Sequence, residues 1–270
     1  MWWFQQGLSI LPSALVIWTS ASFLLPYITA VLLSHVDPLV PYISDTGTTP
    51  PERCLFGIML NIAALLGIAT MYVRYKQVSA LNPEEPKILR LNKVGVVLGM
   101  ISCFGLCITA NFQKSTLFSI HVTGASLTFG IGAIYFLIQT VLSYKMQPGI
   151  HGKDIFLIRL TIVLWCFLSI AGMFISSMTL YSGLCGPGLA QKLHWNPEDK
   201  CYAIHIVSTV SEWSLAFSFV SFFLTYIRDF QPEGPYLACK ISLRTEALLH
   251  GHNLYHTHQQ LLADEGVLST

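Results

Sequence analysis

The 270-residue chain has very little charge: Asp, Glu, Lys and Arg make up 11% of it, whereas hydrophobic residues make up 53%. So few charged residues leave too little polar surface for a water-soluble globule of this length. The net charge of +1, with cations spread along the chain, also argues against a nucleic-acid partner, because phosphate binding needs cations clustered on one face. The solvent of this protein is therefore expected to be mostly lipid.

Motifs for metals and redox cofactors are missing as well. The seven cysteines form no CxxC pair and no zinc or haem spacing, so no cofactor and no metal site is expected. The chain has no Asn-x-Ser/Thr sequon, which predicts loops without N-linked glycan. It also has no internal repeat of fixed period, which weakens a transporter interpretation based on inverted repeats.

The chain instead has six long apolar runs, each of about the length needed to cross roughly 30 Å of hydrocarbon as a helix. They are continuous and do not alternate with period two, which favours helices over a β-barrel. The predicted fold class is therefore an all-α polytopic membrane protein with six transmembrane helices, near Leu8–Leu33, Leu55–Val73, Val94–Ala110, Leu117–Leu142, Phe156–Leu180 and Tyr202–Ile227.

Lys and Arg residues are divided unevenly between alternate loops. With a cytosolic N-terminus, eleven lie on the cytosolic side and four on the other, namely Arg53, Lys114, Lys192 and Lys200. This satisfies the positive-inside rule and places both termini in the cytosol. The cytosolic connection Arg74–Lys93 is expected to be a solvated loop. Residues 1–231 form the predicted transmembrane domain, and residues 232–270 form a flexible cytosolic tail.

The loops on the other side face a lumen or the exterior, where cysteines meet an oxidising compartment. Cys185 and Cys201 flank one such loop and are a candidate disulfide. Spacing alone does not establish the short Cα–Cα distance that a disulfide needs, and Cys54 is a competing third cysteine on the same side.

Glu212 is the only acidic residue well inside a predicted span, so it should face the bundle interior and be protonated or paired. His205 lies two helical turns earlier on the same face, and His121 lies at similar depth on the fourth span. With Asp45 and Glu52 of the first loop, these residues are candidates for a lumen-facing polar pocket. Three interpretations stay open: hydrogen bonds that only fix helix packing, a pH- or lipid-responsive site, and general acid–base catalysis.

Other motifs carry weaker signals. Asp45-Thr46-Gly47 matches the aspartic-protease tripeptide, but that chemistry needs two facing carboxylates and the chain has one copy. Gly95 and Gly99 form a GxxxG motif, which we expect to pack within the bundle rather than in a dimer. The tail holds four closely spaced histidines that are expected to be solvated rather than metal-bound, His250, His252, His256 and His258.

Several longer motifs resemble a known family: PYISDTGTTPPE in the first loop, ANFQ at Ala110–Gln113, HWNPEDK at His194–Lys200, Glu212-Trp213 and FLTYIRDFQ at Phe223–Gln231. In this order they are similar to the damage-regulated autophagy modulator family, part of the wider FRAG/DRAM/SFK group. The resemblance runs from the N-terminus to about Gln231.

The resemblance implies a six-span protein of the lysosomal membrane that promotes or regulates autophagy, with links to cell death; other endomembranes or the plasma membrane are further locations. It supplies no catalytic residues, so a non-enzymatic regulator is expected. Its expected partners are the lipid bilayer and either autophagy machinery or other lysosomal membrane proteins. Relatives in the wider group are similar to lipid-remodelling factors, which makes a lipid-binding or lipid-remodelling protein the alternative. An acidic dileucine sorting signal has a carboxylate before its two leucines. This chain has Thr257 at that position, so the signal is degenerate. Tyr75–Val78 is another candidate sorting signal.

Overall fold

The computed structural model describes residues 8–147, 152–186 and 188–230. Within those residues the regular elements are all helical, and six helices are long and apolar enough to span a membrane. The predicted all-α, six-span fold is confirmed. The tail proposed at residues 232–270, with its histidines and Thr257, lies outside the described part. The spans are α2 (Ile10–Leu32), α3 (Glu52–Leu81), α4 (Pro86–Asn111), the composite Phe118–Lys145, α7 (Lys153–Tyr181) and α8 (Tyr202–Asp229).

The fourth span is not one regular helix. It begins as α5 (Phe118–Ala125), continues as a π-helical segment η2 (Ser126–Ile131) and ends as α6 (Gly132–Lys145). A π turn is wider than an α turn and is often found at functional sites. The irregular segment lies near the middle of the span and includes Phe129.

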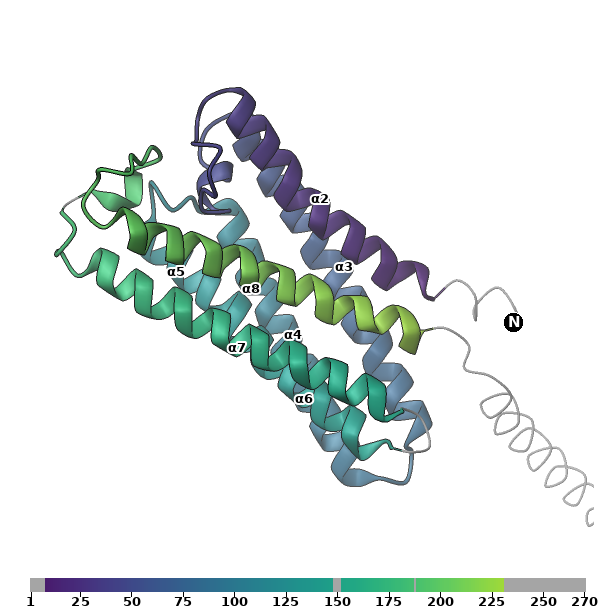
Figure 1. Ribbon diagram of the computed structural model, residues 1–270. Helices are drawn as coiled ribbons and strands as arrows, with labels where there is room; N and C mark the ends of the chain where they lie inside the picture. Colours follow the sequence, from purple (N-terminus) through teal and green to yellow (C-terminus); the bar gives the residue numbers. More distant parts are fainter. Residues whose placement is uncertain (1–7, 148–151, 187, 231–270) are drawn as a thin grey trace, which may run out of the picture.

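The six spans lie side by side (Figure 1), and the contacts between them form a closed ring. Each helix packs against the next one along the chain, and α8 returns to pack against α2. Three connections gather at one end of this ring, here called the loop end: residues 33–51, 112–117 and 182–201. The other end, where α3, α6 and α8 finish and α4 and α7 begin, is called the basic end.

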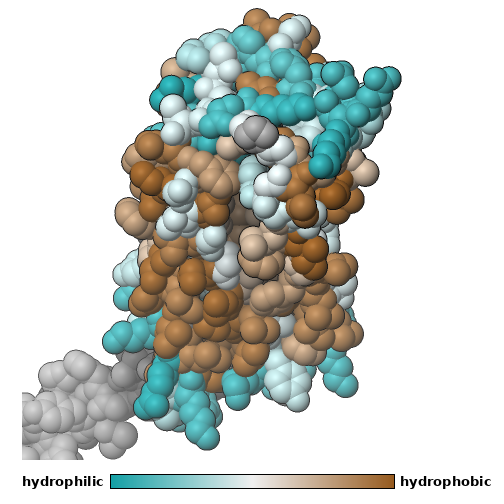
Figure 2. Space-filling model, turned by 90° about the vertical axis from the view of Figure 1, so that its left-hand side faces the viewer, coloured by the Kyte–Doolittle hydropathy of each residue, from teal (hydrophilic) through white to brown (hydrophobic). Residues whose placement is uncertain are grey.

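Large apolar side chains cover the outside of the ring. Leu168 is 74% exposed and Ile17 is 70% exposed, although both lie in the middle of their helices. Such side chains are unfavourable in water but not in hydrocarbon, where apolar groups are the solvent-facing ones. Figure 2 shows this apolar belt on one face, between polar residues at the two ends. The pattern fits a protein whose ring is surrounded by lipid.

Glycines let the backbones of α4 and the fourth span approach closely. A Cβ added at Gly105 would lie 2.7 Å from the backbone nitrogen of Thr128, and one added at Gly124 would lie 2.9 Å from that of Thr109. Added Cβ atoms at Gly95 and Gly99 would likewise meet side chains of α3 and α6. The GxxxG motif therefore packs within this bundle, as predicted.

The solvated loop predicted at Arg74–Lys93 is wrong for most of its length. The helix α3 continues to Leu81, and α4 starts at Pro86, leaving a connection of residues 82–85. Val78 is fully buried against Ile88 and Leu142, and this packing extends the helices beyond the apolar runs. The candidate signal Tyr75–Val78 is thus helical, with its last side chain inaccessible to a cytosolic protein.

Two arginines near the ends of the spans are buried and not exposed to solvent. Arg74 and Arg159 are buried inside the ring at the basic end, with exposures of 1% and 0%. Both form ion pairs with Asp229, at 3.3 Å for Arg74, and Arg159 also donates to Ser143. Buried charges are stable only when paired and hydrogen-bonded in this way. These residues hold α3, α7 and α8 together rather than lying at the headgroups.

Candidate functional site

The three loops at the loop end are tied to the ring and to one another. The indole nitrogen of Trp213 in α8 donates to the carbonyl of Pro41, at 2.8 Å, and so holds the first loop. The first loop in turn holds the last one, because Asp37 accepts hydrogen bonds from the backbone of Trp195 and from His194, at 2.7 and 3.0 Å. The loops thus form an ordered cover over this end.

A disulfide joins Cys185 to Cys201, whose Cα atoms are 5.9 Å apart. It closes the last loop directly before α8. Cys54, the competing third cysteine, is a free and exposed thiol. The loop that supplies Trp195 is therefore fixed at both of its ends.

Beneath this cover lies a buried ion pair between two loops. The ammonium nitrogen of Lys114 is 2.5 Å from a carboxylate oxygen of Asp45, and both side chains are at most 6% exposed. The same nitrogen lies over the ring of Tyr42, 4.0 Å from its centroid. Burial disfavours the ammonium, but the carboxylates of Asp45 and Glu212 outweigh it and raise the pKa of Lys114. We therefore treat Lys114 as charged.

Glu212 supports the same loop from below. One of its carboxylate oxygens accepts a hydrogen bond from the backbone nitrogen of Ile43, at 2.7 Å. Glu212 therefore faces the bundle interior, in the place where the first loop crosses over α8. Its interaction links a residue of the last span to a residue 169 positions earlier in the chain.

The other predicted site residues have contact partners of their own. His205 is stacked on Trp195, with ring centroids 4.1 Å apart, and also contacts the edge of Tyr42. His121 binds the carbonyl of Phe112 at 2.7 Å, and Glu52 pairs with His35 at 2.5 Å. The structure thus brings Glu212 and Asp45 to Lys114, but it does not gather both imidazoles and three carboxylates in one pocket.

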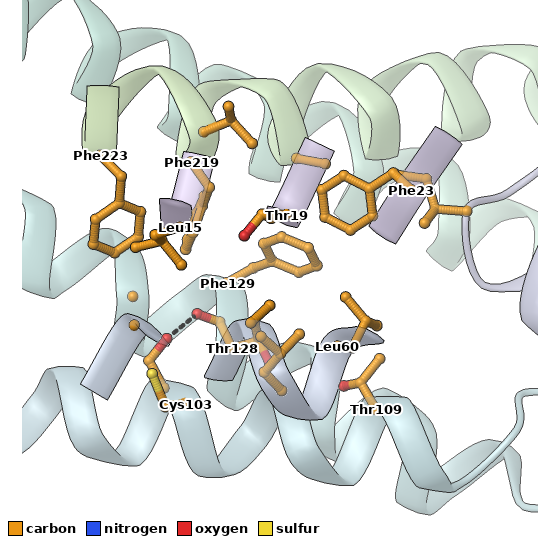
Figure 3. Close-up of a pocket in the computed structure, with 18 of the residues that line it drawn as sticks. Leu15, Thr19, Phe23, Leu60, Cys103, Thr109, Thr128, Phe129, Phe219 and Phe223 are labelled. Carbon is orange, nitrogen blue, oxygen red and sulfur yellow. Dashed lines mark hydrogen bonds between the residues drawn. The ribbon is translucent and has the colours of Figure 1, made fainter. Parts of the chain in front are cut away.

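Two cavities meet at Glu212. The central one has a volume of about 100 Å³ and lies inside the ring, between α2, α3, α4, the fourth span and α8 (Figure 3). Its lining is apolar apart from a few hydroxyl groups and Glu212; the Ser102 hydroxyl donates to the carbonyl of Thr128, at 2.7 Å. Phe129 of the π segment points into it, as the close-up shows.

The second cavity is larger, about 400 Å³, and lies at the side of the ring. It separates α5 and η2 from α7, which packs against α6 further along the span. Its polar part holds Lys114, His121 and Glu212, and its remaining wall is mostly apolar. Ser44, Phe129 and Glu212 line both cavities, so these three residues lie at the boundary between them.

Sequence reasoning missed Lys114 and the π segment. Lys114 lies in a short polar connection, a pattern that predicts exposure to solvent. Only the fold shows that the first loop buries it. A π turn has no sequence signature in an apolar run. The buried cluster of Arg74, Arg159 and Asp229 was also not predicted, because these residues lie beyond the ends of the apolar runs or, for Arg159, close to an end.

Comparison with known proteins identifies the family. A family model described as the Frag1/DRAM/Sfk1/Cwh43P N-terminal domain matches residues 7–233. The chain belongs to this family. The residues of the ring and of the loop end all lie within the matched range, so the site is part of the Frag1/DRAM domain itself.

Individual relatives narrow this further. DNA damage-regulated autophagy modulator protein 2 of Mus musculus is 65% identical over 95% of this chain and 93% of its own length. The Homo sapiens protein of the same name is 65% identical over 95% of this chain and 94% of its own length. DNA damage-regulated autophagy modulator protein 1 of Xenopus laevis is 42% identical over 85% of this chain and 93% of its own length. The predicted family resemblance is confirmed, and this chain is more similar to these protein 2 relatives than to this protein 1 relative. No solved structure matches the chain.

Proposed function

We propose that this chain regulates autophagy as a multi-pass protein of the lysosomal membrane, and that it acts through other proteins rather than as an enzyme. The observation that carries the proposal is 65% identity over 95% of the chain to relatives named autophagy modulators. Those names supply the process. The membrane, the partners and the mode of action belong to the proposal.

The proposal includes an orientation, with the basic end and both termini in the cytosol. It is supported by the eleven-to-four distribution of Lys and Arg in the sequence. The disulfide between Cys185 and Cys201 supports it independently, because a lumen is oxidising and the cytosol is not. In this orientation autophagy machinery meets the basic end and the tail, and lysosomal membrane proteins meet the belt.

The contacts of the polar residues support a non-enzymatic role. Glu212 accepts a backbone hydrogen bond, Lys114 pairs with Asp45, and His121 binds a carbonyl oxygen. A general acid or base must instead be within hydrogen-bond reach of a reacting group. Each of these side chains already has a partner whose loss would loosen the loop end.

A second candidate function is binding of lipid, with lipid remodelling as its enzymatic form. The specific observation in its favour is the 400 Å³ cavity between the fourth span and α7. This volume falls within the range of about 300–1,000 Å³ typical of small-molecule sites. An apolar wall with a few polar groups at one end is the lining that an amphiphile requires.

Rescue of autophagic flux in cells that lack the protein distinguishes the two candidates. We expect a chain ending after Gln231 to reach lysosomes and fail to restore flux, because the tail carries partner contacts. We expect Glu212→Gln to restore flux, because glutamine keeps the oxygen that accepts from Ile43. Glu198→Gln, at an exposed position of the last loop, is the matched control.

The opposite pattern would overturn the partner-based mode. A correctly located Glu212→Gln or His205→Ala protein without activity, beside an active truncated chain, would favour lipid handling at the loop end. Rescue of flux by the truncated chain would by itself show that the tail is not required.

A further inference from the structure

The cavity between the fourth span and α7 opens sideways into the apolar belt. Of the residues that line it, Phe174 is 65% exposed, Met178 is 60% exposed and Val122 is 42% exposed. All three lie on the outer surface of membrane-spanning helices, which hydrocarbon surrounds. A molecule can therefore enter from the bilayer without crossing the loop cover.

Lys114 gives the inner end of this cavity an incomplete set of hydrogen bonds. An ammonium group has three donors. Among the described residues, Asp45 supplies the one oxygen atom paired with Lys114 Nζ, at 2.5 Å, which leaves further donors of the ammonium group without an acceptor. A buried donor without an acceptor costs free energy. An oxygen atom of a bound molecule would remove that cost.

The charges around the cavity limit what this oxygen can belong to. Lys114 is the only Lys or Arg among the residues that line the cavity, and Asp45 already balances its charge. Glu212 adds a second acidic group beside it. A phosphate or a carboxylate entering here would meet the acidic side chain of Glu212 and a cation whose charge Asp45 already balances. Uncharged hydroxyl and carbonyl groups have no such penalty, because Lys114 can donate to them and Glu212 can accept from them.

We propose that this cavity binds a membrane lipid with an uncharged polar end, one that carries hydroxyl and ester or amide carbonyl groups, as in diacylglycerol. The polar end lies against Lys114 and Glu212, and an acyl chain lies along the apolar wall toward Phe174. This inference rests on the lipid-binding candidate function. It does not depend on the autophagy role, so each can fail alone.

Gly130 provides a way to close the cavity without disturbing the fold. It lines the cavity, its backbone is helical, and a Cβ added there would have no atom within 4 Å. Gly130→Trp should therefore fill the cavity. Val97→Trp is the matched control, because Val97 is 52% exposed on α4 and lines neither cavity.

The experiment uses the full-length protein in nanodiscs that contain photoactivatable diacylglycerol or photoactivatable phosphatidic acid with the same chains. We expect the diacylglycerol probe to label η2 and α7 about tenfold more than the phosphatidic acid probe does, a ratio that corresponds to about 1.4 kcal/mol. Gly130→Trp should abolish this labelling, and Val97→Trp should leave it unchanged.

Three results would overturn the proposal: equal labelling around the belt, labelling that survives Gly130→Trp, or a preference for phosphatidic acid. If Gly130→Trp does not fold, Ser126→Trp takes its place, because Ser126 is an exposed residue at the same opening. Lost labelling with retained autophagic flux separates this inference from the proposed function.

Discussion

Lys114 connects the parts of the loop end. Its loop joins α4 to α5, its carboxylate partner Asp45 belongs to the first loop, and Tyr42 covers its ammonium group. Taking two charges out of water is expensive, so a buried pair is kept only while both partners are present. The pair therefore makes the position of the first loop depend on the hairpin of the third and fourth spans.

Removing one member of this pair should be worse than removing both. We expect Lys114→Met to lower the free energy of unfolding by about 3–5 kcal/mol, because Asp45 is left as a buried unpaired charge. The double variant Lys114→Met/Asp45→Leu should recover a large part of this loss. Thermal denaturation of the two variants in detergent measures both losses of stability. If the loss in the double variant equals the sum of the losses from Lys114→Met and Asp45→Leu made singly, the two residues are not coupled.

Asp37 should keep its loop contacts at mildly acidic pH. Partial burial opposes ionisation, but the hydrogen bonds from His194 and from the Trp195 backbone prevail and hold the pKa of Asp37 below its ordinary value of 3.8. A lowered pKa means that the contact is at full strength above pH 3.8 and is lost as the pH falls through the lower, folded value.

The corresponding measurement is tryptophan fluorescence from pH 7 to pH 3, with Trp195→Phe subtracted to isolate Trp195. We expect no transition down to about pH 5, the range of acidic organelles, and a change only in stronger acid. A transition between pH 7 and pH 5 would instead point to histidines, which titrate in that range. Asp37→Asn, which removes the carboxylate, should show a weakened contact at every pH.

The orientation of a single residue was predictable from the sequence only where a charged residue stands inside an apolar run. Glu212 stands alone in an apolar run, so its inward orientation followed from the cost of a charge in lipid. The partners of His205 and Glu52 did not follow, because Trp195 and His35 come from loops whose path depends on the whole fold. The Cys185–Cys201 spacing suggested a pair, but only the observed Cα–Cα distance shows that these cysteines can bond.

The π segment η2 is the irregular element on which both cavities depend. Just before and within it, Gly124 and Thr128 lie against α4, while Phe129 and Gly130 face the cavities. The tight packing on one side and the open space on the other are properties of one short stretch. Gly124 therefore allows close packing against α4, whereas Gly130 of the same span faces open space.

Alanine substitutions should separate these roles. Gly105→Ala places a Cβ 2.6 Å from Leu127 Cβ and 2.7 Å from the Thr128 nitrogen, so α4 and η2 must move apart. We expect a loss of about 1–3 kcal/mol, as for other overpacked sites. Gly130→Ala meets open space and should stabilise the helix by about 0.5–1 kcal/mol. Thermal denaturation of both variants measures these changes; a Gly105→Ala protein as stable as the wild type would contradict the close approach of α4 and η2.

The number of helices was predictable, but their ends were not. Each apolar run indicates hydrocarbon depth, whereas α3 continues to Leu81 and α7 starts at Lys153, beyond that depth. Burial of Val78 stabilises the extra turn of α3, and pairing of Asp229 with Arg159 stabilises the end of α8 beyond its apolar run. Such contacts depend on partners that are distant in sequence, so hydropathy does not show them.

The ring is held at its two ends by different means. At the basic end, Arg74, Arg159 and Asp229 are buried between helices, whereas at the loop end the polar contacts run mainly through loops. Between them lie the apolar belt and the two cavities. The basic end is therefore held by ion pairs between helices, and the loop end by contacts between loops.

Autophagic flux in cells that lack the protein, rescued by two forms of the wild-type chain, tests the central claim most directly. One form is allowed to reach lysosomes, and the other carries a retention signal that keeps it in the endoplasmic reticulum. The account predicts reduced flux on loss, full rescue by the lysosomal form and no rescue by the retained form. Unchanged flux on loss, or equal rescue by both forms, would contradict a regulator that acts from the lysosomal membrane.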